Sequence, residues 1–320
     1  MWFNIIMGNH GETGTSGYLD PLVGYQRSAL SACGHEVTVV WDDIRPDAIN
    51  LFFEYFPIPK FVDNVRRLRR ASLIKFGIIA TELMVGRTIP YAQHGMIYDG
   101  DKPTMLRNRI AGYEALSRDV DFVWSWLQRT AEETQQFNTA SEFFPVGHVV
   151  DVPRGLRRSP KDIDVLFFGT RTPHRERLLD TFRVKGISVV CVGRNFSTGY
   201  HSRLKLDSLI DRAKIGLNLN LHGEHETETG IDPRFASCMR IVDMLEREAC
   251  IVSEHIPLDN PYAGYMQCAE PQDLADVCRA LLAEDRWRVA GEEAASRFRV
   301  EMDVTKICAP VIERTLEWIQ

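Results

Sequence analysis

Two charged side chains, Arg240 and Asp243, stand one helical turn apart in the stretch TETGIDPRFASCMRIVDMLEREACIVSE, residues 227–254. The stretch predicts a loop, a helix and then a short apolar strand at 249–252. A helix N-terminus offers unpaired backbone N–H groups and a partial positive charge, so a phosphate could bind there beside Arg240, with Asp243 reaching a ribose. Taken alone, the stretch favours the simpler alternative of solvent-exposed ion pairs at helical spacing.

Further polar residues of the second half follow the ends of two predicted strands. They are Gly169, Thr170, Arg171 and Arg175 after the strand 164–168, and Asn218 and Asn220 on the strand 214–221. Backbone amides and guanidinium groups together could hold a phosphate, or the first group could be a solvated strand-to-helix turn. Because parallel strands end at one edge of a sheet, we expect these residues to converge with Arg240 on one ligand.

The first half has its own candidate site in the glycine-rich loop GNHGETGTSG, residues 8–17, which follows the strand 3–7. Gly11 and Gly14 could let the backbone approach a ligand closely, although the spacing is not that of a dinucleotide loop and a flexible turn is an equal alternative. Three side chains expected at the same strand ends are candidates for a catalytic base: His10, Glu82 and His94.

Apolar segments that alternate with helical stretches position these residues. The predicted strands are 3–7, 36–41, 49–56, 76–80 and 121–126 in the first half, and 164–168, 187–192, 214–221, 249–253 and 266–269 in the second. Strands separated by helices predict α/β domains with parallel sheets. The proline-containing basic segment 144–160 suits a crossing between domains. We therefore predict domains at residues 1–150 and 151–304, and a terminal helix, 305–320, whose apolar stripe could pack back on the first domain.

Composition argues against several classes of protein. The 320 residues are 44% hydrophobic and 26% charged, as in ordinary globular proteins. A net charge of −6 does not favour non-specific nucleic-acid binding, so we predict no nucleic-acid partner. Seven scattered cysteines without metal-ligand spacing predict reduced, buried thiols, a cytoplasmic location and no metal site.

No signal peptide or integral membrane segment is predicted, because the apolar N-terminal run turns polar after seven residues. The spacing of apolar and basic residues in the segment 61–75 predicts a basic amphipathic helix. It could contact an anionic membrane peripherally, although a surface helix packed on the sheet is the favoured interpretation. The basic residues of this helix are Arg66, Arg67, Arg69 and Arg70.

Four segments within residues 160–300 resemble the group-1 glycosyltransferases of the CgeB type. They are FFGTRTPHR, GLNLNLH, RIVD and ACIVSE, where that family has a strand ending in FxG(T/S) followed by Pro and Arg, an NLH-like strand, an R-x-F-E helix and an apolar strand. The resemblance implies a GT-B fold, in which two Rossmann-like domains with parallel sheets face each other across a cleft. It also implies that the C-terminal domain binds a nucleotide-diphospho-sugar and that the sugar passes to an unidentified acceptor.

Residue by residue, the resemblance implies that Arg240 contacts the diphosphate and that Asp243, in place of the family's Glu, contacts the ribose hydroxyls. Thr170 and Arg175 would line the phosphate path. No separate cofactor is implied. Arginines and helix amides can stabilise a leaving diphosphate without a metal, and DGD at 99–101 is interpreted as a turn.

Two other functions remain as alternatives to glycosyl transfer. One is a non-catalytic GT-B-shaped binding or partner protein, because Phe235 stands where family-4 retaining enzymes carry Glu and Asp243 replaces the usual Glu. The other is a nucleotide-sugar epimerase, which would change the sugar without an acceptor. The donor base, the sugar, the stereochemistry and the oligomeric state do not follow from the sequence.

Overall fold

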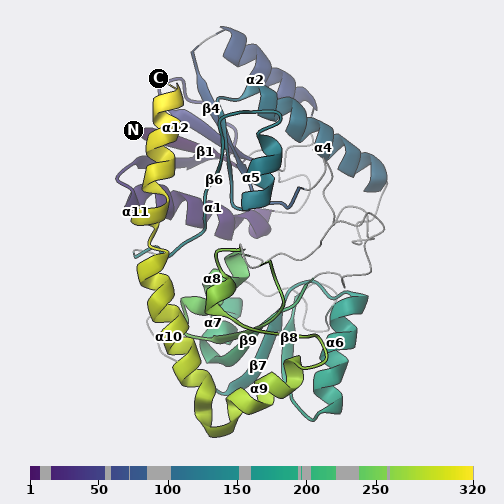
Figure 1. Cartoon of the computed structure of the whole chain (residues 1–320). Helices are drawn as coiled ribbons and strands as arrows, with labels where there is room; N and C mark the ends of the chain where they lie inside the picture. Colours follow the sequence, from purple (N-terminus) through teal and green to yellow (C-terminus); the bar gives the residue numbers. More distant parts are fainter. Residues whose placement is uncertain are drawn as a thin grey trace. The chain divides into compact units, whose positions relative to one another are not determined.

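The chain divides into two units, which a computed structural model shows in Figure 1. The structure describes residues 1–7, 16–54, 59–71, 73–84, 102–150, 160–193, 196, 203–220, 238–257 and 260–319. The first unit comprises Met1–Val152 together with Val304–Gln320, and the second comprises Pro153–Asp303. Each unit is built on its own parallel sheet.

The first sheet has six strands in the order β2-β1-β3-β4-β5-β6. They are β1 (Trp2–Ile6), β2 (Glu36–Val40), β3 (Ile49–Phe53), β4 (Lys75–Ala80), β5 (Phe122–Ser125) and β6 (Ser141–Phe143). Every neighbouring pair is parallel, and parallel strands require crossover connections. The described helices of these connections are α1 (Ser16–Ala32), α2 (Pro59–Ala71), α4 (Lys102–Asp119) and α5 (Gln128–Thr134).

The core of this unit explains why its strands are nearly continuous runs of apolar residues. Helices cover a parallel sheet on both faces, so successive side chains are buried whichever way they point. All five residues of β3 are buried. Trp124 of β5 stacks on Phe144, with ring centres 4.8 Å apart, and lies 4.7 Å from the ring centre of Phe122.

The last helices of the chain belong to the first unit. They are α11 (Val304–Ile307) and α12 (Ala309–Ile319). The indole N–H of Trp124 donates to the Thr315 hydroxyl at 2.8 Å, and both side chains are fully buried. Arg314 makes a two-pronged ion pair with Glu142, at 2.9 and 2.6 Å. The C-terminal segment therefore packs on the first sheet.

Helix α2 lies beside α4 (Figure 1), and its buried Val65 joins the core cluster of the first unit. Two of its four arginines form ion pairs with carboxylates of the same unit, Arg66 with Asp119 and Arg69 with Asp121. The packing is that of a surface helix. No helix within the described ranges is both long enough and apolar enough to cross a bilayer.

The second sheet has five parallel strands in the order β11-β10-β9-β7-β8. They are β7 (Ile163–Phe168), β8 (Val189–Val192), β9 (Ala213–Asn218), β10 (Cys250–Glu254) and β11 (Gln267–Ala269). The described helices are α6 (Pro173–Val184), α7 (Arg203–Arg212), α8 (Cys238–Leu245), α9 (Leu274–Leu282) and α10 (Arg286–Glu301), with 3₁₀ turns at Ala263–Tyr265 and Ala283–Asp285.

Strand order locates the place where a ligand would bind in each sheet. In the second unit the chain runs from β7 outward to β8, then returns to the other side of β7 as β9. The crossovers leave in opposite directions there, and open α/β sheets bind ligands beyond the carboxyl ends of the strands at such a point. In the first unit β1 occupies the equivalent place between β2 and β3.

The predicted α/β class with two parallel sheets is confirmed. Every strand predicted from the sequence is present, with ends that differ by up to three residues. Strand β6 and helix α10 were not predicted from the sequence. All seven cysteines are free thiols, and four of them are buried, two are half-buried and Cys268 is exposed.

Candidate functional site

Two glycines bring the exits of β7 and β8 close together in the second unit. Gly169 follows β7 with φ +154°, and its N–H donates to the Val192 carbonyl at 2.9 Å. Gly193 follows β8 with φ +134°, and a Cβ there would clash with the Gly169 carbonyl. A Cβ on Gly169 would lie 2.8 Å from Nη2 of Arg240. Both glycines therefore allow a close approach, and the one at 169 leaves room for a guanidinium group.

Arg175 ties the exits of β7 and β9 together from the first turn of α6. Its side chain is buried, and its backbone N–H donates to the hydroxyl of Thr172, the N-cap of the helix. Its guanidinium donates to three backbone carbonyls, at 2.8, 2.8 and 3.0 Å: those of Thr170, Leu219 and Asn220. Arg175 lies at the predicted edge of the sheet, and its hydrogen bonds hold together the segments that follow β7 and β9.

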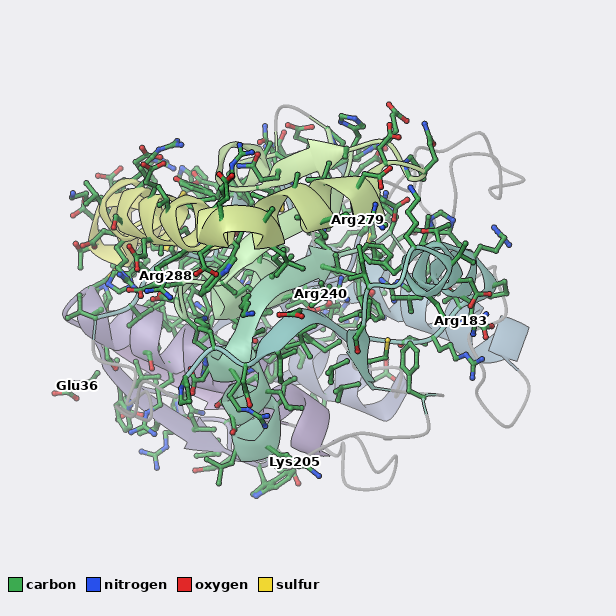
Figure 2. The ribbon with its side chains drawn as sticks, turned by 90° about the horizontal axis from the view of Figure 1, so that it is seen from below. Glu36, Arg183, Lys205, Arg240, Arg279 and Arg288 are labelled. Carbon is green, nitrogen blue, oxygen red and sulfur yellow. The ribbon has the colours of Figure 1, made fainter. Side chains whose placement is uncertain are left out.

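Arg240 lies at the same edge on α8. Its Nη1 donates to Oδ1 of Asn218 at 3.2 Å. The guanidinium carbon lies 5.6 and 5.7 Å from the ring centres of Phe167 and Phe168. Figure 2 labels Arg240 near the middle of the view and Arg183 toward its outer side. The charge is thus held in one place by a hydrogen bond and by contact with two aromatic rings.

A polar chain continues from Arg240 into β10. Asn218 is buried, and its Nδ2 donates to the Ser253 hydroxyl at 2.9 Å. That hydroxyl donates to the carbonyl oxygen of Glu254 at 2.6 Å. Buried hydrogen bonds of this kind hold polar side chains in a single arrangement. Gly169, Arg175, Asn218 and Arg240 therefore lie at one edge of the second sheet, and their convergence on a ligand stays a prediction.

The carboxylate of Glu254 is a buried member of the site that sequence reasoning missed. One oxygen lies 2.8 Å from Nε2 of His174, and the other accepts the backbone N–H of Asn220 at 2.6 Å. Glu254 and His174 are both more than nine-tenths buried. The sequence does place both residues near this edge, because Glu254 ends an apolar strand of a parallel sheet and His174 follows the first proline of a helix.

Asp243 lies one turn from Arg240 on α8, but its side chain bonds to α7 whereas that of Arg240 bonds to the end of β9. Both of its carboxylate oxygens are bonded by Arg203 of α7, one of them at 2.9 Å. Arg247 donates to the Asp243 carbonyl at 3.2 Å and also pairs with Asp207 and Asp211 of α7, at 2.9 and 3.1 Å. Burial opposes the charged form of Arg203, yet its bonds to Asp243 raise its pKa above the usual value.

The remaining predicted residues are less closely associated with this edge. Arg171 is exposed and pairs with Glu176. Thr170 contributes its backbone carbonyl to Arg175. Cys238 begins α8, and burial raises its pKa to about 12, so its thiol is not ionised at neutral pH. The described part of the chain has no group of three or more His, Cys, Asp or Glu side chains arranged to hold a metal ion.

In the first unit, Glu82 lies two residues beyond the end of β4 and is half-buried. Its N–H donates to the buried Glu54 carboxylate at 2.8 Å, and its carbonyl accepts the Thr130 hydroxyl at 2.9 Å. The same oxygen of Glu54 accepts the N–H and the hydroxyl of Thr81, each at 2.7 Å. Glu54 was not predicted. His10, Gly11, Gly14, His94 and Phe235 lie outside the described residues.

No protein-family model and no curated protein sequence matches this chain. Solved structures do resemble it. A DNA-modifying β-glucosyltransferase, solved with and without uridine diphosphoglucose, is 13% identical over 100% of this chain and 99% of its own, with a TM-score of 0.55. OtsA is 10% identical over 98% of each chain, with a TM-score of 0.55.

TarM is 10% identical over 87% of this chain and 56% of its own, with a TM-score of 0.52. This chain therefore spans little more than half the length of TarM. With the two parallel sheets, these likenesses show that the chain has the GT-B fold.

Proposed function

We propose that the protein is a glycosyltransferase that takes a sugar from a nucleotide-diphospho-sugar and passes it to an acceptor. The observation that carries the proposal is the position of Arg240 in a GT-B chain, at the carboxyl edge between β7 and β9. This is where α/β sheets hold phosphate-bearing ligands. The β-glucosyltransferase of similar fold is described with the substrate uridine diphosphoglucose, and TarM with UDP.

The proposed chemistry needs a group that stabilises the leaving diphosphate. Cleavage of the sugar–phosphate bond places positive charge on the ring and negative charge on the diphosphate. A guanidinium group already fixed in place stabilises that negative charge without reorganising during the reaction. Arg240 is held by Asn218 and by two phenylalanine rings, so it meets this requirement. In this proposal the positive charge comes from arginine and no metal takes part.

Asp243 is proposed to accept the ribose hydroxyls while it remains bonded to Arg203. A carboxylate has about four acceptor positions, of which Arg203 occupies two. The pair also fixes the direction of the carboxylate. Arg203 would thus prepare Asp243 for the ribose instead of competing with it.

The acceptor is proposed to bind at the first unit. A base there would take the proton of the attacking hydroxyl if the reaction inverts the sugar. The candidates are His10, Glu82 and His94. For Glu82, the support is its place at the carboxyl end of β4, where the Glu54 carboxylate and the Thr130 hydroxyl hold its backbone.

The experiment is a thermal-shift screen with UDP, ADP, GDP and dTDP, their glucose conjugates, and UDP-N-acetylglucosamine. A ligand at about 100 times its Kd adds about 2.7 kcal/mol to the free energy of unfolding, which corresponds to a rise in Tm of several degrees. Arg240→Ala should weaken nucleotide binding at least tenfold, because bonds from charged donors are strong.

Arg183→Ala is the matched control. Arg183 lies in the last turn of α6, at the other end of the helix from Arg175. Its side chain is 78% exposed, and its partner is Asp180 of the same helix. This variant should bind nucleotide as the wild type does. An unchanged Tm with every ligand would contradict the proposal. Proton NMR of the donor after incubation without an acceptor then separates the alternatives. A transferase releases free sugar by slow hydrolysis, a binding protein leaves the donor intact, and an epimerase converts the sugar to an isomer of the same mass.

A further inference from the structure

The side-chain oxygen of Asn220 is a buried hydrogen-bond acceptor. The proposed contacts to the diphosphate and the ribose do not involve it. Asn220 lies two residues beyond the end of β9, and only 5% of its surface is exposed. Among the described residues, no donor lies within hydrogen-bond distance of its Oδ1. Native proteins rarely leave a buried carbonyl oxygen without a donor, and such exceptions need an explanation.

The backbone of Asn220 is held on both sides. Its N–H donates to Glu254 at 2.6 Å, and its carbonyl accepts Nε of Arg175 at 3.0 Å. Glu254 is held in turn by His174, at 2.8 Å. The polar side chain of Asn220 thus projects from a rigid frame, as a binding site requires.

The order of residues along the sheet edge indicates which ligand group lies near Asn220. Helix α8 connects two parallel strands, so it runs antiparallel to them, and Asp243 lies one turn further from the carboxyl edge than Arg240. Asn220 lies on the other side, two residues beyond the Asn218 that Arg240 contacts. Asp243, Arg240 and Asn220 therefore follow one another along the direction of β9.

A nucleotide-sugar has the same order of parts: ribose, diphosphate and sugar. We infer that Oδ1 of Asn220 accepts a hydrogen bond from a hydroxyl of the transferred sugar. The inference rests on the proposed function and deepens it by naming a residue that selects the sugar. A buried acceptor discriminates strongly, because a sugar without the matching hydroxyl leaves it without a partner.

The test compares the Kd of a nucleoside diphosphate with the Kd of its glucose conjugate, using the pair with the largest thermal shift in the screen above. In Asn220→Ala, the Kd of the nucleoside diphosphate should stay within about twofold, while the glucose conjugate should bind roughly tenfold more weakly. The 2-, 3-, 4- and 6-deoxy derivatives of the sugar identify the hydroxyl. One of them should bind the wild type roughly tenfold more weakly and show no further loss with Asn220→Ala.

Asn220→Asp keeps the shape and the acceptor oxygens, so it should retain the preference for the glucose conjugate within about threefold. It also keeps the test decisive if Asn220→Ala does not fold. Equal losses for the nucleoside diphosphate and its conjugate would overturn the inference, as would deoxy derivatives that all bind the wild type alike. A Tm change in Asn220→Ala with unchanged ligand preference would also overturn it. If the wild type binds no nucleotide, the proposed function fails first and this inference fails with it.

Discussion

Asp243 of α8 and Arg203 of α7 form a two-pronged ion pair in which the Asp243 residue is only 8% exposed. The pair joins two helices across 40 residues of sequence. It places Asp243 away from the sheet edge that its neighbour Arg240 reaches. Because α8 also carries Arg240, the ion pair that holds α8 against α7 also holds the proposed phosphate contact in place.

Arg203→Met should lower the free energy of unfolding by about 1–2 kcal/mol. Breaking a fully buried pair costs more, but the Arg203 side chain is 37% exposed and Arg247 remains near Asp243. Asp243→Asn should cost a similar amount, and the double variant should cost less than the sum. Denaturant unfolding measures all three. Strictly additive costs would show that the two side chains do not depend on each other.

Gly169→Ala should damage nucleotide binding as well as stability. The new methyl group would lie 2.8 Å from Nη2 of Arg240, in a backbone conformation with φ +154°. We expect affinity for the nucleoside diphosphate to fall roughly tenfold, the loss expected when one hydrogen bond to a charged group is displaced. Isothermal titration calorimetry measures the change.

Gly186→Ala is the control for this glycine. Gly186 also has a positive φ, +71°, but nothing lies within 4 Å of its Cβ position. It should cost about 1 kcal/mol of stability and leave nucleotide affinity unchanged. Equal affinities for the two alanine variants would mean that Gly169 does not protect the position of Arg240.

Thr315→Val should destabilise the first unit by about 1–3 kcal/mol. The substitution keeps the shape of the side chain but removes the acceptor of the buried Trp124 indole N–H. Thr315→Ser keeps the hydroxyl, so it should cost less. Tryptophan fluorescence during denaturant unfolding reports the transition. A valine variant as stable as the serine variant would show that this hydrogen bond contributes little to the docking of α12.

Lys161 should make the stability of the second unit depend on alkaline pH. Burial lowers its pKa to about 8, although the nearby carboxylates of Asp211 and Glu248 favour the charged form. Below about pH 8 both the folded and the unfolded chain carry the proton. Between pH 8 and the ordinary lysine pKa of 10.5 the unfolded chain binds more protons, so the free energy of unfolding rises with pH.

The comparison is with Lys161→Met, which cannot titrate. The stability of the wild type relative to this variant should increase by roughly 1–2 kcal/mol between pH 7.5 and about 10, after allowance for the exposed part of the side chain. Taking the difference cancels the titration of the cysteines and tyrosines. A flat difference across this range would mean that the Lys161 ammonium is not desolvated.

The strands and the α/β class could be predicted because their signals are local. Apolar runs such as 49–53 must be buried on both faces, and alternation with helices leaves a parallel sheet as the solution. The three residues of β6 carry no such signal, because Glu142 and Phe143 are only half-buried and the strand pairs on one side alone, with β5. A short edge strand is identified mainly by its hydrogen bonds to the neighbouring strand, which the sequence does not show.

The order of residues along the chain establishes which polar residues follow which strands. Strand order then brought Gly169, Arg175, Asn218 and Arg240 to one edge, and that convergence was predictable because parallel strands end together. The partner that each side chain contacts there depends on how the elements pack in three dimensions. This packing assigns Arg175 to three backbone carbonyls, Asp243 to Arg203, and Glu254 to His174 and Asn220. Apart from Thr170, these partners are tens of residues away in the sequence. Helical or strand periodicity gives a direction within one element, but no information about the side chain that meets it from another element.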